Sequence, residues 1–108
     1  MSYCVTFANI DLIPKKITKT LSKKLEDSNY GWYLTEDNQI ELAENWISIT
    51  TEGLEEDLLL LYKLKIRGEF ITYDDYIDII KYTINDNGIV ALDQVLTDGE
   101  TLWESKPK

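Results

Sequence analysis

The residues best suited to chemistry lie in the stretch TYDDYIDIIKYTINDNG, residues 72–88. It places Asp74, Asp75 and Asp78 beside three tyrosines. On a helix, Asp74 and Asp78 would stand about 6 Å apart along the axis. A carboxylate pair can act as general acid and base in hydrolysis. Carboxylates at this spacing can also occupy arginine and lysine sites that ordinarily bind phosphates, and a third interpretation is a solvated helix face with no ligand.

Several chemistries are excluded by residue types that the chain lacks. It contains no histidine, which removes Ser-His and Cys-His nucleophile pairs and every His-containing metal site. Cys4 is the only cysteine, so thiolate zinc sites, iron-sulfur clusters and an internal disulfide are excluded as well. Neither of the glycine-rich phosphate-binding loops, G-x-x-x-x-G-K-[ST] or G-x-G-x-x-G, occurs. We therefore expect no cofactor.

One segment faintly resembles a calcium-binding loop. In TINDNGIVALDQ, residues 83–94, Gly88 falls on the sixth position of such a loop. The first position is Thr83 and the twelfth is Gln94, where calcium binding requires an acid and a bidentate carboxylate. The sequence therefore predicts a helix end that runs into a strand, and no metal site.

Charge is the most informative bulk property. Twenty acidic residues against eleven basic ones give a net charge of −9. Residues 1–25 hold five lysines and one aspartate, whereas residues 26–108 hold nineteen acids and six bases. A surface this acidic repels nucleic acid and attracts basic partners. The alternative interpretation is that the charge only keeps the protein soluble.

The first half of the chain alternates between strand and helix patterns. Residues 2–8 alternate with a period of two, which predicts a strand. Pro14 and an apolar stripe beginning at Ile17 predict an amphipathic, lysine-rich helix over about 14–27. A hairpin is predicted over 31–43 and a strand over 46–50.

The second half is predicted as a loop, a long strand and a helix. An acidic loop is expected around Gly53, and the alternation of apolar and charged residues predicts a strand over 58–70. Thr72 and Asp75 form a T-x-x-D capping pattern that predicts a helix over 72–87. Apolar residues then flank an Asp98-Gly99 turn, which is typical of a hairpin.

These elements predict the α+β class in a single domain, residues 1–108. We expect a mainly antiparallel sheet of five to seven strands with two helices, at about 14–27 and 72–87. The N-terminal residues lack the features of a signal peptide, and no apolar run approaches the length of a membrane span. The expected location is the cytoplasm of a producing cell or of a host.

Acidic pairs and clusters recur throughout the chain after residue 25. Small acidic α+β proteins of similar size and charge include toxin-immunity proteins, DNA mimics and anti-CRISPR proteins, an analogy of charge, size and composition alone. We therefore predict a non-enzymatic inhibitor of a basic, nucleic-acid-acting protein such as a nuclease, with no direct binding to nucleic acid or membrane. The predicted contact residues are Glu55, Glu56, Asp57, Asp74, Asp75, Asp78 and Tyr82.

Two alternatives belong to other classes. One is a small hydrolase or ligand-binding domain with a carboxylate site, which a cleft lined by convergent acids would favour. The other is a structural or regulatory subunit that forms a homodimer, with the basic segment of one copy against the acidic surface of the other. A convex acidic face would favour the inhibitor.

Overall fold

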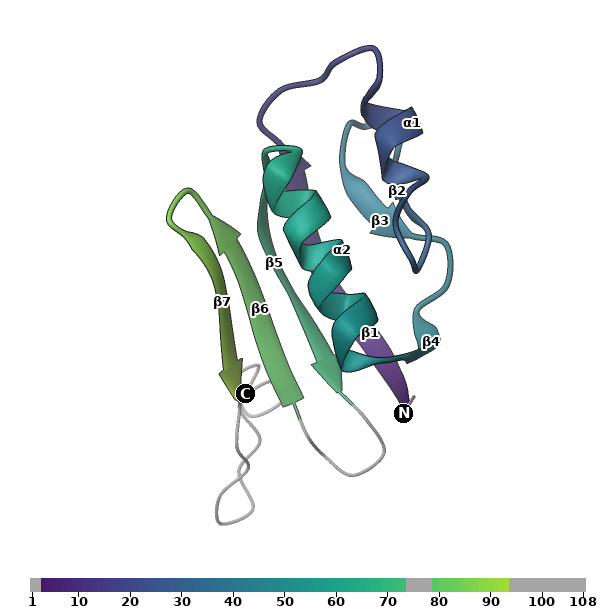
Figure 1. Ribbon diagram of the computed structural model, residues 1–108, viewed down its shortest axis with the longest axis vertical. Helices are drawn as coiled ribbons and strands as arrows, with labels where there is room; N and C mark the ends of the chain where they lie inside the picture. The colour runs from purple at the N-terminus through teal and green to yellow at the C-terminus, as the bar shows by residue number, and fades with distance from the viewer. Residues whose placement is uncertain (1–2, 74–78, 94–108) are drawn as a thin grey trace, which may run out of the picture.

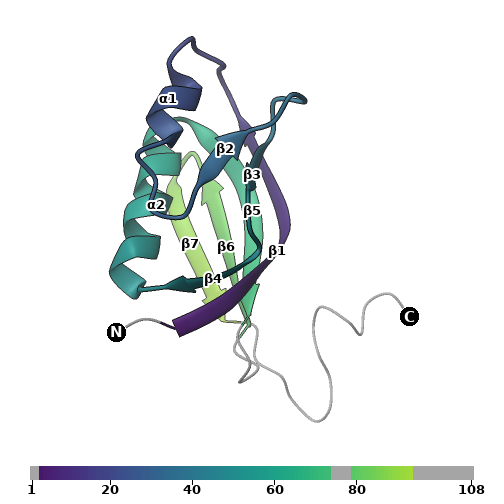
Figure 2. The ribbon, with the colours of Figure 1, turned by 90° about the vertical axis from the view of Figure 1, so that its right-hand side faces the viewer.

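The computed structural model describes residues 3–73 and 79–93, and these form the predicted α+β fold. In this part of the chain, seven strands make one antiparallel sheet and two helices lie on the same side of it (Figures 1 and 2). The elements are β1 (Tyr3–Pro14), α1 (Leu21–Leu25), β2 (Trp32–Leu34), β3 (Ile40–Leu42), β4 (Trp46–Ile49), α2 (Thr51–Lys63), β5 (Ile66–Tyr73), β6 (Ile79–Asn85) and β7 (Gly88–Asp93).

The long strand β1 organises the sheet, whose order is β2-β3-β1-β5-β6-β7. One edge of β1 pairs with β5 along most of its length. Its other edge pairs first with β4, from Tyr3 opposite Ile49, and later with β3, where Leu12 lies opposite Ile40. β1 therefore joins the β2–β3 hairpin to the β5–β6–β7 meander.

A bulge bends β1 at its middle. The register with β5 shifts between Ala8 and Asp11, and Asn9 in this interval has a φ of 54°. Gly68 of β5 faces the bulge with a φ of 139°. A Cβ atom there would overlap the carbonyl oxygen of Asp11, so this close approach of two backbones requires glycine.

The core lies between the sheet and the helices. Aromatic rings form its centre: the Phe70 ring centroid is 5.5 Å from that of Phe7, and 5.3 Å from those of Trp32 and Tyr82. Fully buried aliphatic side chains of α2 and β5, such as Leu61 and Ile66, pack into the same cluster. Its apolar surface supplies the main driving force for folding.

Several sequence predictions are confirmed. From Tyr3 onward, the strand predicted at 2–8 is the first part of β1. The hairpin predicted at 31–43 is β2 and β3, and the strand predicted at 46–50 is β4. The helix expected over 14–27 is much shorter, because β1 continues to Pro14 and α1 covers only Leu21–Leu25. Within α1, Leu21 and Leu25 are buried at the predicted i, i+4 spacing.

The prediction of an acidic loop at Gly53 and a strand over 58–70 is wrong. Residues 51–63 form α2, and the strand begins only at Ile66. Leu54, Leu58 and Leu61 are buried at i, i+4 and i+7, a helical repeat that extends across the expected loop. The chain leaves α2 through Lys65, whose φ of 64° makes the reversal without glycine.

The helix expected over 72–87 is also wrong, because the described residues of this range form strands and the turn at Asp86 and Asn87. Tyr73 of β5 pairs with Ile79 of β6, and the ladder continues to Gly68 opposite Ile84. Isoleucine, tyrosine and threonine dominate β6, and these residues favour strands where cross-strand partners are available. Asp74, Asp75 and Asp78 lie outside the described residues, as does the expected hairpin at Asp98-Gly99.

Candidate functional site

Helix α2 begins at a side-chain cap. Thr50 is extended, and its hydroxyl accepts the backbone N–H of Gly53 at 2.9 Å. Such a cap satisfies one of the free N–H groups of the first turn. The Thr50 N–H in turn donates to the Tyr30 hydroxyl at 3.1 Å. The start of α2 is therefore fixed to the segment before β2.

The amphipathic pattern of α2 leaves one set of acids outside. Leu54, Leu58 and Leu61 are buried in the core, while Glu52, Glu55 and Glu56 are exposed. We call these three the α2 carboxylates. No lysine or arginine of the described residues lies within ion-pair distance of them.

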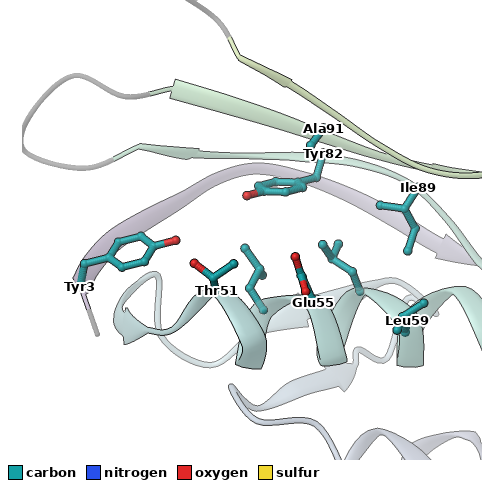
Figure 3. A pocket seen from close by; sticks show the side chains of 9 residues that line it. Tyr3, Thr51, Glu55, Leu59, Tyr82, Ile89 and Ala91 are labelled. Carbon is teal, nitrogen blue, oxygen red and sulfur yellow. The ribbon is translucent and has the colours of Figure 1, made fainter. Parts of the chain in front are cut away.

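A pocket lies between α2 and the strands β6 and β7 (Figure 3). Its volume is about 400 Å³. The residues that line it are Tyr3, Thr51, Leu54, Glu55, Leu58, Leu59, Tyr82, Ile89 and Ala91.

The pocket has a polar end and an apolar end. Hydroxyl groups of Tyr3, Thr51 and Tyr82 gather near the start of α2, and the Glu55 side chain extends from the helix toward the sheet (Figure 3). Leu59 and Ile89 lie at the other end. An apolar hollow with a few convergent polar groups is the usual form of a binding site for a small molecule or a side chain.

Tyr82 forms a rigid wall of this pocket. Its ring stacks on buried Phe70, with an interplanar angle of 26°. Burial raises the pKa of the Tyr82 hydroxyl, the neighbouring Tyr3 and Glu55 raise it further, and a hydrogen bond with Thr72 partly opposes them. The hydroxyl therefore stays protonated at neutral pH and can act as donor or acceptor.

Two other predicted contact residues lie away from the pocket. Asp57 is only 1% exposed, and its two carboxylate oxygens accept the backbone N–H groups of Asn29 at 2.7 Å and Tyr30 at 3.2 Å. Glu56 is exposed and accepts from the Asn29 side-chain amide at 3.0 Å. Asp57 thus stabilises the segment before β2 from within the fold, whereas Glu56 stands at the surface.

Opposing effects act on the pKa of Asp57, and burial is the largest of them. Burial raises the pKa of this carboxyl above its ordinary value, and the Asn29 and Tyr30 N–H groups and the nearby Trp32 indole oppose the rise. Among the described residues, no acceptor forms a hydrogen bond of good geometry with the buried Nε1–H of Trp32. This carboxylate is best understood as a structural acceptor for backbone groups.

The structure therefore brings together only part of the predicted site. Glu55 and Tyr82 meet in the pocket although they are 27 positions apart in the chain. Tyr3, Ile89 and Ala91 were not predicted as contact residues, because only the pairing of β1, β6 and β7 in one sheet brings them under α2. Within the sequence itself, no local pattern marks them.

One lysine of the basic N-terminal segment, Lys15, forms an ion pair at the protein surface with Asp86, which also pairs with Arg67 of β5. Lys15 Nζ lies 3.1 Å from the Asp86 carboxylate, and Arg67 Nε lies 2.8 Å from the same group. Arg67 also stacks over the Tyr62 ring at 4.7 Å. These contacts join the end of β1 and the β6–β7 turn to β5, and β5 to the last turn of α2.

The described residues contain neither a metal-binding cluster nor a membrane-spanning helix. Across residues 3–73 and 79–93, no three acidic or cysteine side chains converge on a point where they could hold a metal ion. The helices in this same part of the chain are too short and too polar to span a membrane. Comparison with protein-family models, curated proteins and solved structures found no significant match.

Proposed function

We propose that the protein is a non-enzymatic binding protein that blocks a basic, nucleic-acid-acting partner with the α2 carboxylates and the adjacent pocket. The observation that carries this proposal is that Glu52, Glu55 and Glu56 stand exposed on one capped helix with no cationic side chain of the described residues in ion-pair distance. Exposed acids that the fold does not pair remain available to a partner's arginines and lysines.

The arrangement of these acids supports phosphate imitation. Glu52 and Glu56 are one helical turn apart, about 6 Å along the axis. The leucines behind them are anchored in the core, so the carboxylates are presented from a rigid element. Together with a net charge of −9, such a surface speeds encounter with a basic protein and repels nucleic acid.

The hydrolase alternative is supported less. Acid–base hydrolysis by carboxylates requires two of them across a substrate, whereas Glu55 is the single carboxylate that lines the pocket within the described residues. The homodimer alternative needs the lysines of one copy to face the α2 carboxylates of another. Lys15 is already paired with Asp86, which reduces what that segment can offer.

The proposal includes the cytoplasm of the producing cell or of a host as the place of action, and a nuclease or another nucleic-acid-binding enzyme as the partner. To test it, the immobilised protein is exposed to lysate of the native cell, with and without a DNA duplex as competitor. Captured proteins are identified by mass and purified, and their binding to DNA is measured with increasing amounts of the acidic protein. A DNA-binding protein that DNA displaces from the column, and that loses DNA stoichiometrically in solution, is the expected result.

A matched pair of variants makes this test specific. Glu52→Gln with Glu55→Gln and Glu56→Gln removes three charges from α2. Three exposed acids on the β2–β3 hairpin are neutralised as the control: Glu36, Asp37 and Glu41. Inhibition should be lost in the first variant and retained in the second. If both variants lost inhibition equally, net charge alone would explain the inhibition. If neither variant lost inhibition, the proposed surface on α2 would be refuted.

A further inference from the structure

We propose that the pocket between α2 and β6–β7 receives one arginine side chain of the partner, held by Glu55 at the polar end. This inference rests on the proposed function, because the partner supplies the arginine, and it adds the anchoring residue and its site. Three features of the pocket lead to it: a carboxylate with no cationic partner among the described residues, flanking tyrosines and an apolar wall.

The first feature is the charge at the polar end. Glu55 extends from α2 toward the sheet, and the Tyr3, Thr51 and Tyr82 hydroxyls are its polar neighbours in the pocket. Among the residues that the structure describes, no lysine or arginine lines the pocket. Because a carboxylate in a partly enclosed site binds a cation more strongly than a neutral or acidic group, the ligand is expected to be an arginine or lysine side chain.

The second feature distinguishes arginine from lysine. A guanidinium has five donors in a planar fork, so it can bind the Glu55 carboxylate with two of them and still reach hydroxyl oxygens. It also stacks on aromatic rings. The chain shows that geometry once already, where Arg67 lies over Tyr62 at 4.7 Å, and Tyr82 offers a ring fixed against Phe70.

The third feature is the apolar wall. Leu54, Leu58 and Ile89 line the hollow together with the polar groups, and Ile89 lies at the end away from the hydroxyls (Figure 3). Arginine stems pack along apolar surface while the charged head keeps its polar contacts. The volume of about 400 Å³ accommodates the side chain together with the backbone of the segment that carries it.

The experiment uses the full chain and a small probe, so that it does not depend on the partner. Nα-acetyl-L-arginine methylamide is titrated into isotope-labelled protein, and NMR shifts are followed for the Leu54, Ile89 and Ala91 methyl groups and the Tyr82 ring. We expect saturable shifts confined to the pocket, with a dissociation constant on the order of 1 mM for a ligand of this size. The citrulline analogue, which has nearly the same shape without charge, and the lysine analogue are the matched ligands.

Two single substitutions complete the design. Glu55→Gln should weaken binding of the arginine probe about fivefold or more, because it removes a charge-assisted hydrogen bond, while Glu56→Gln should change it less than twofold. Both residues are exposed, so both variants should melt as the wild type does. Equal binding of the citrulline or lysine analogue, or equal effects of the two substitutions, would overturn the assignment.

Binding of the captured partner provides an independent test of the pocket. Ala91→Phe fills the hollow from β7 without changing charge, and it should weaken the complex with the captured partner by at least tenfold. If that variant inhibits normally, the pocket inference fails while the proposed function stands. If the probe binds as expected but no nucleic-acid-acting protein is captured, the proposed function fails while the arginine site stands.

Discussion

The Asp57 carboxylate on α2 accepts the backbone N–H of Asn29 at 2.7 Å, across 28 positions of sequence. A second bond to the Tyr30 N–H makes this one buried side chain the acceptor for two consecutive backbone donors. The segment that enters β2 therefore depends on α2 for its shape. Since Glu56 stands beside Asp57 and is exposed, neighbouring acids on one helix have different roles.

Removal of this acceptor should destabilise the fold. Asp57→Ala leaves the part-buried N–H groups of Asn29 and Tyr30 without this acceptor, and each such loss costs about 1 to 3 kcal/mol. We expect the free energy of unfolding in urea to fall by about 2 to 4 kcal/mol. Glu56→Ala is the control and should cost less than about 0.5 kcal/mol. A loss below that limit in Asp57→Ala would contradict the structural role.

Asp86 predicts a pH dependence of stability. The hydrogen bond from Arg67, and then that from Lys15, hold the pKa of Asp86 below its ordinary value of 3.8. Because the pKa of Asp86 is lower in the folded protein than in the unfolded chain, its ion pairs stabilise the fold fully at pH values above the unfolded-state pKa. This stabilisation is lost as the pH falls through the folded-state pKa. The difference in melting temperature between wild type and Asp86→Asn should therefore shrink as the pH falls below 4.

Asp57→Asn is the internal comparison for that measurement. Burial raises the pKa of Asp57, so the folded state binds a proton more readily than the unfolded chain. The wild type should then gain stability relative to Asp57→Asn as the pH falls toward 3.8, the opposite trend. If the stability difference from wild type changed with pH in the same direction for Asp86→Asn and Asp57→Asn, the opposite pKa shifts of Asp86 and Asp57 would be contradicted.

The bulge in β1 predicts a strict requirement for glycine at position 68. Gly68→Ala places a Cβ against the Asp11 carbonyl oxygen at a positive φ, so the two strands must separate. We expect a loss of more than about 2 kcal/mol in urea unfolding. Gly31→Ala also has a positive φ but meets no atom within 4 Å, and it should cost about 1 kcal/mol. Equal losses would mean that the backbone conformation matters and the close approach does not.

The fold class could be predicted from the sequence, whereas the identity of two segments could not. Alternation of apolar residues marks β1 and the β2–β3 hairpin because each has one buried face. Residues 58–70 contain the end of α2 and the start of β5 within one apolar run. Lys65 takes the positive φ between them, where a glycine would usually mark the end of the helix. For residues 72–87 the capping pattern at Thr72 is outweighed by cross-strand pairing of β5 with β6.

The same reasoning explains what could be foreseen of the site. Glu55 and Tyr82 were chosen for charge and residue type, and the fold brings both into one pocket. Asp57 was chosen for its place in an acidic run, but its burial depends on the helical phase of α2. Tyr3 enters the pocket because β1 lies beside β4 and β5, a relationship between distant segments that no local pattern reveals.

The helical phase of α2 gives a sharp test of the corrected structure. Leu61 is fully buried, whereas Leu59 two positions before it is 50% exposed. On a strand these two residues would share a face. Leu61→Asp should abolish cooperative unfolding, since it buries an unpaired charge, and Leu59→Asp should change stability by less than about 1 kcal/mol. Circular dichroism during thermal melting distinguishes them, and equal damage would favour the strand.

The aspartates at 74, 75 and 78 lie outside the described residues, and their imitation of phosphate remains a prediction. If Asp74 and Asp78 serve recognition and not the fold, neutralising both to asparagine should leave the melting temperature unchanged. A carboxylate that meets an arginine in a desolvated interface is worth roughly 2 to 5 kcal/mol when it is lost. Partner affinity should therefore fall much further than stability.

Salt dependence separates imitation of phosphate from simple solubility. Affinity for the captured partner is measured at low and high salt for wild type, for Asp74→Asn with Asp78→Asn, and for Glu36→Gln with Asp37→Asn as the control of equal charge. Removing charges that contact the partner should weaken binding and make its salt dependence shallower, because fewer screened contacts remain. The control should bind like wild type. Unchanged affinity and unchanged melting in the Asp74/Asp78 variant would mean that these two aspartates only keep their segment in water, and would leave recognition to α2.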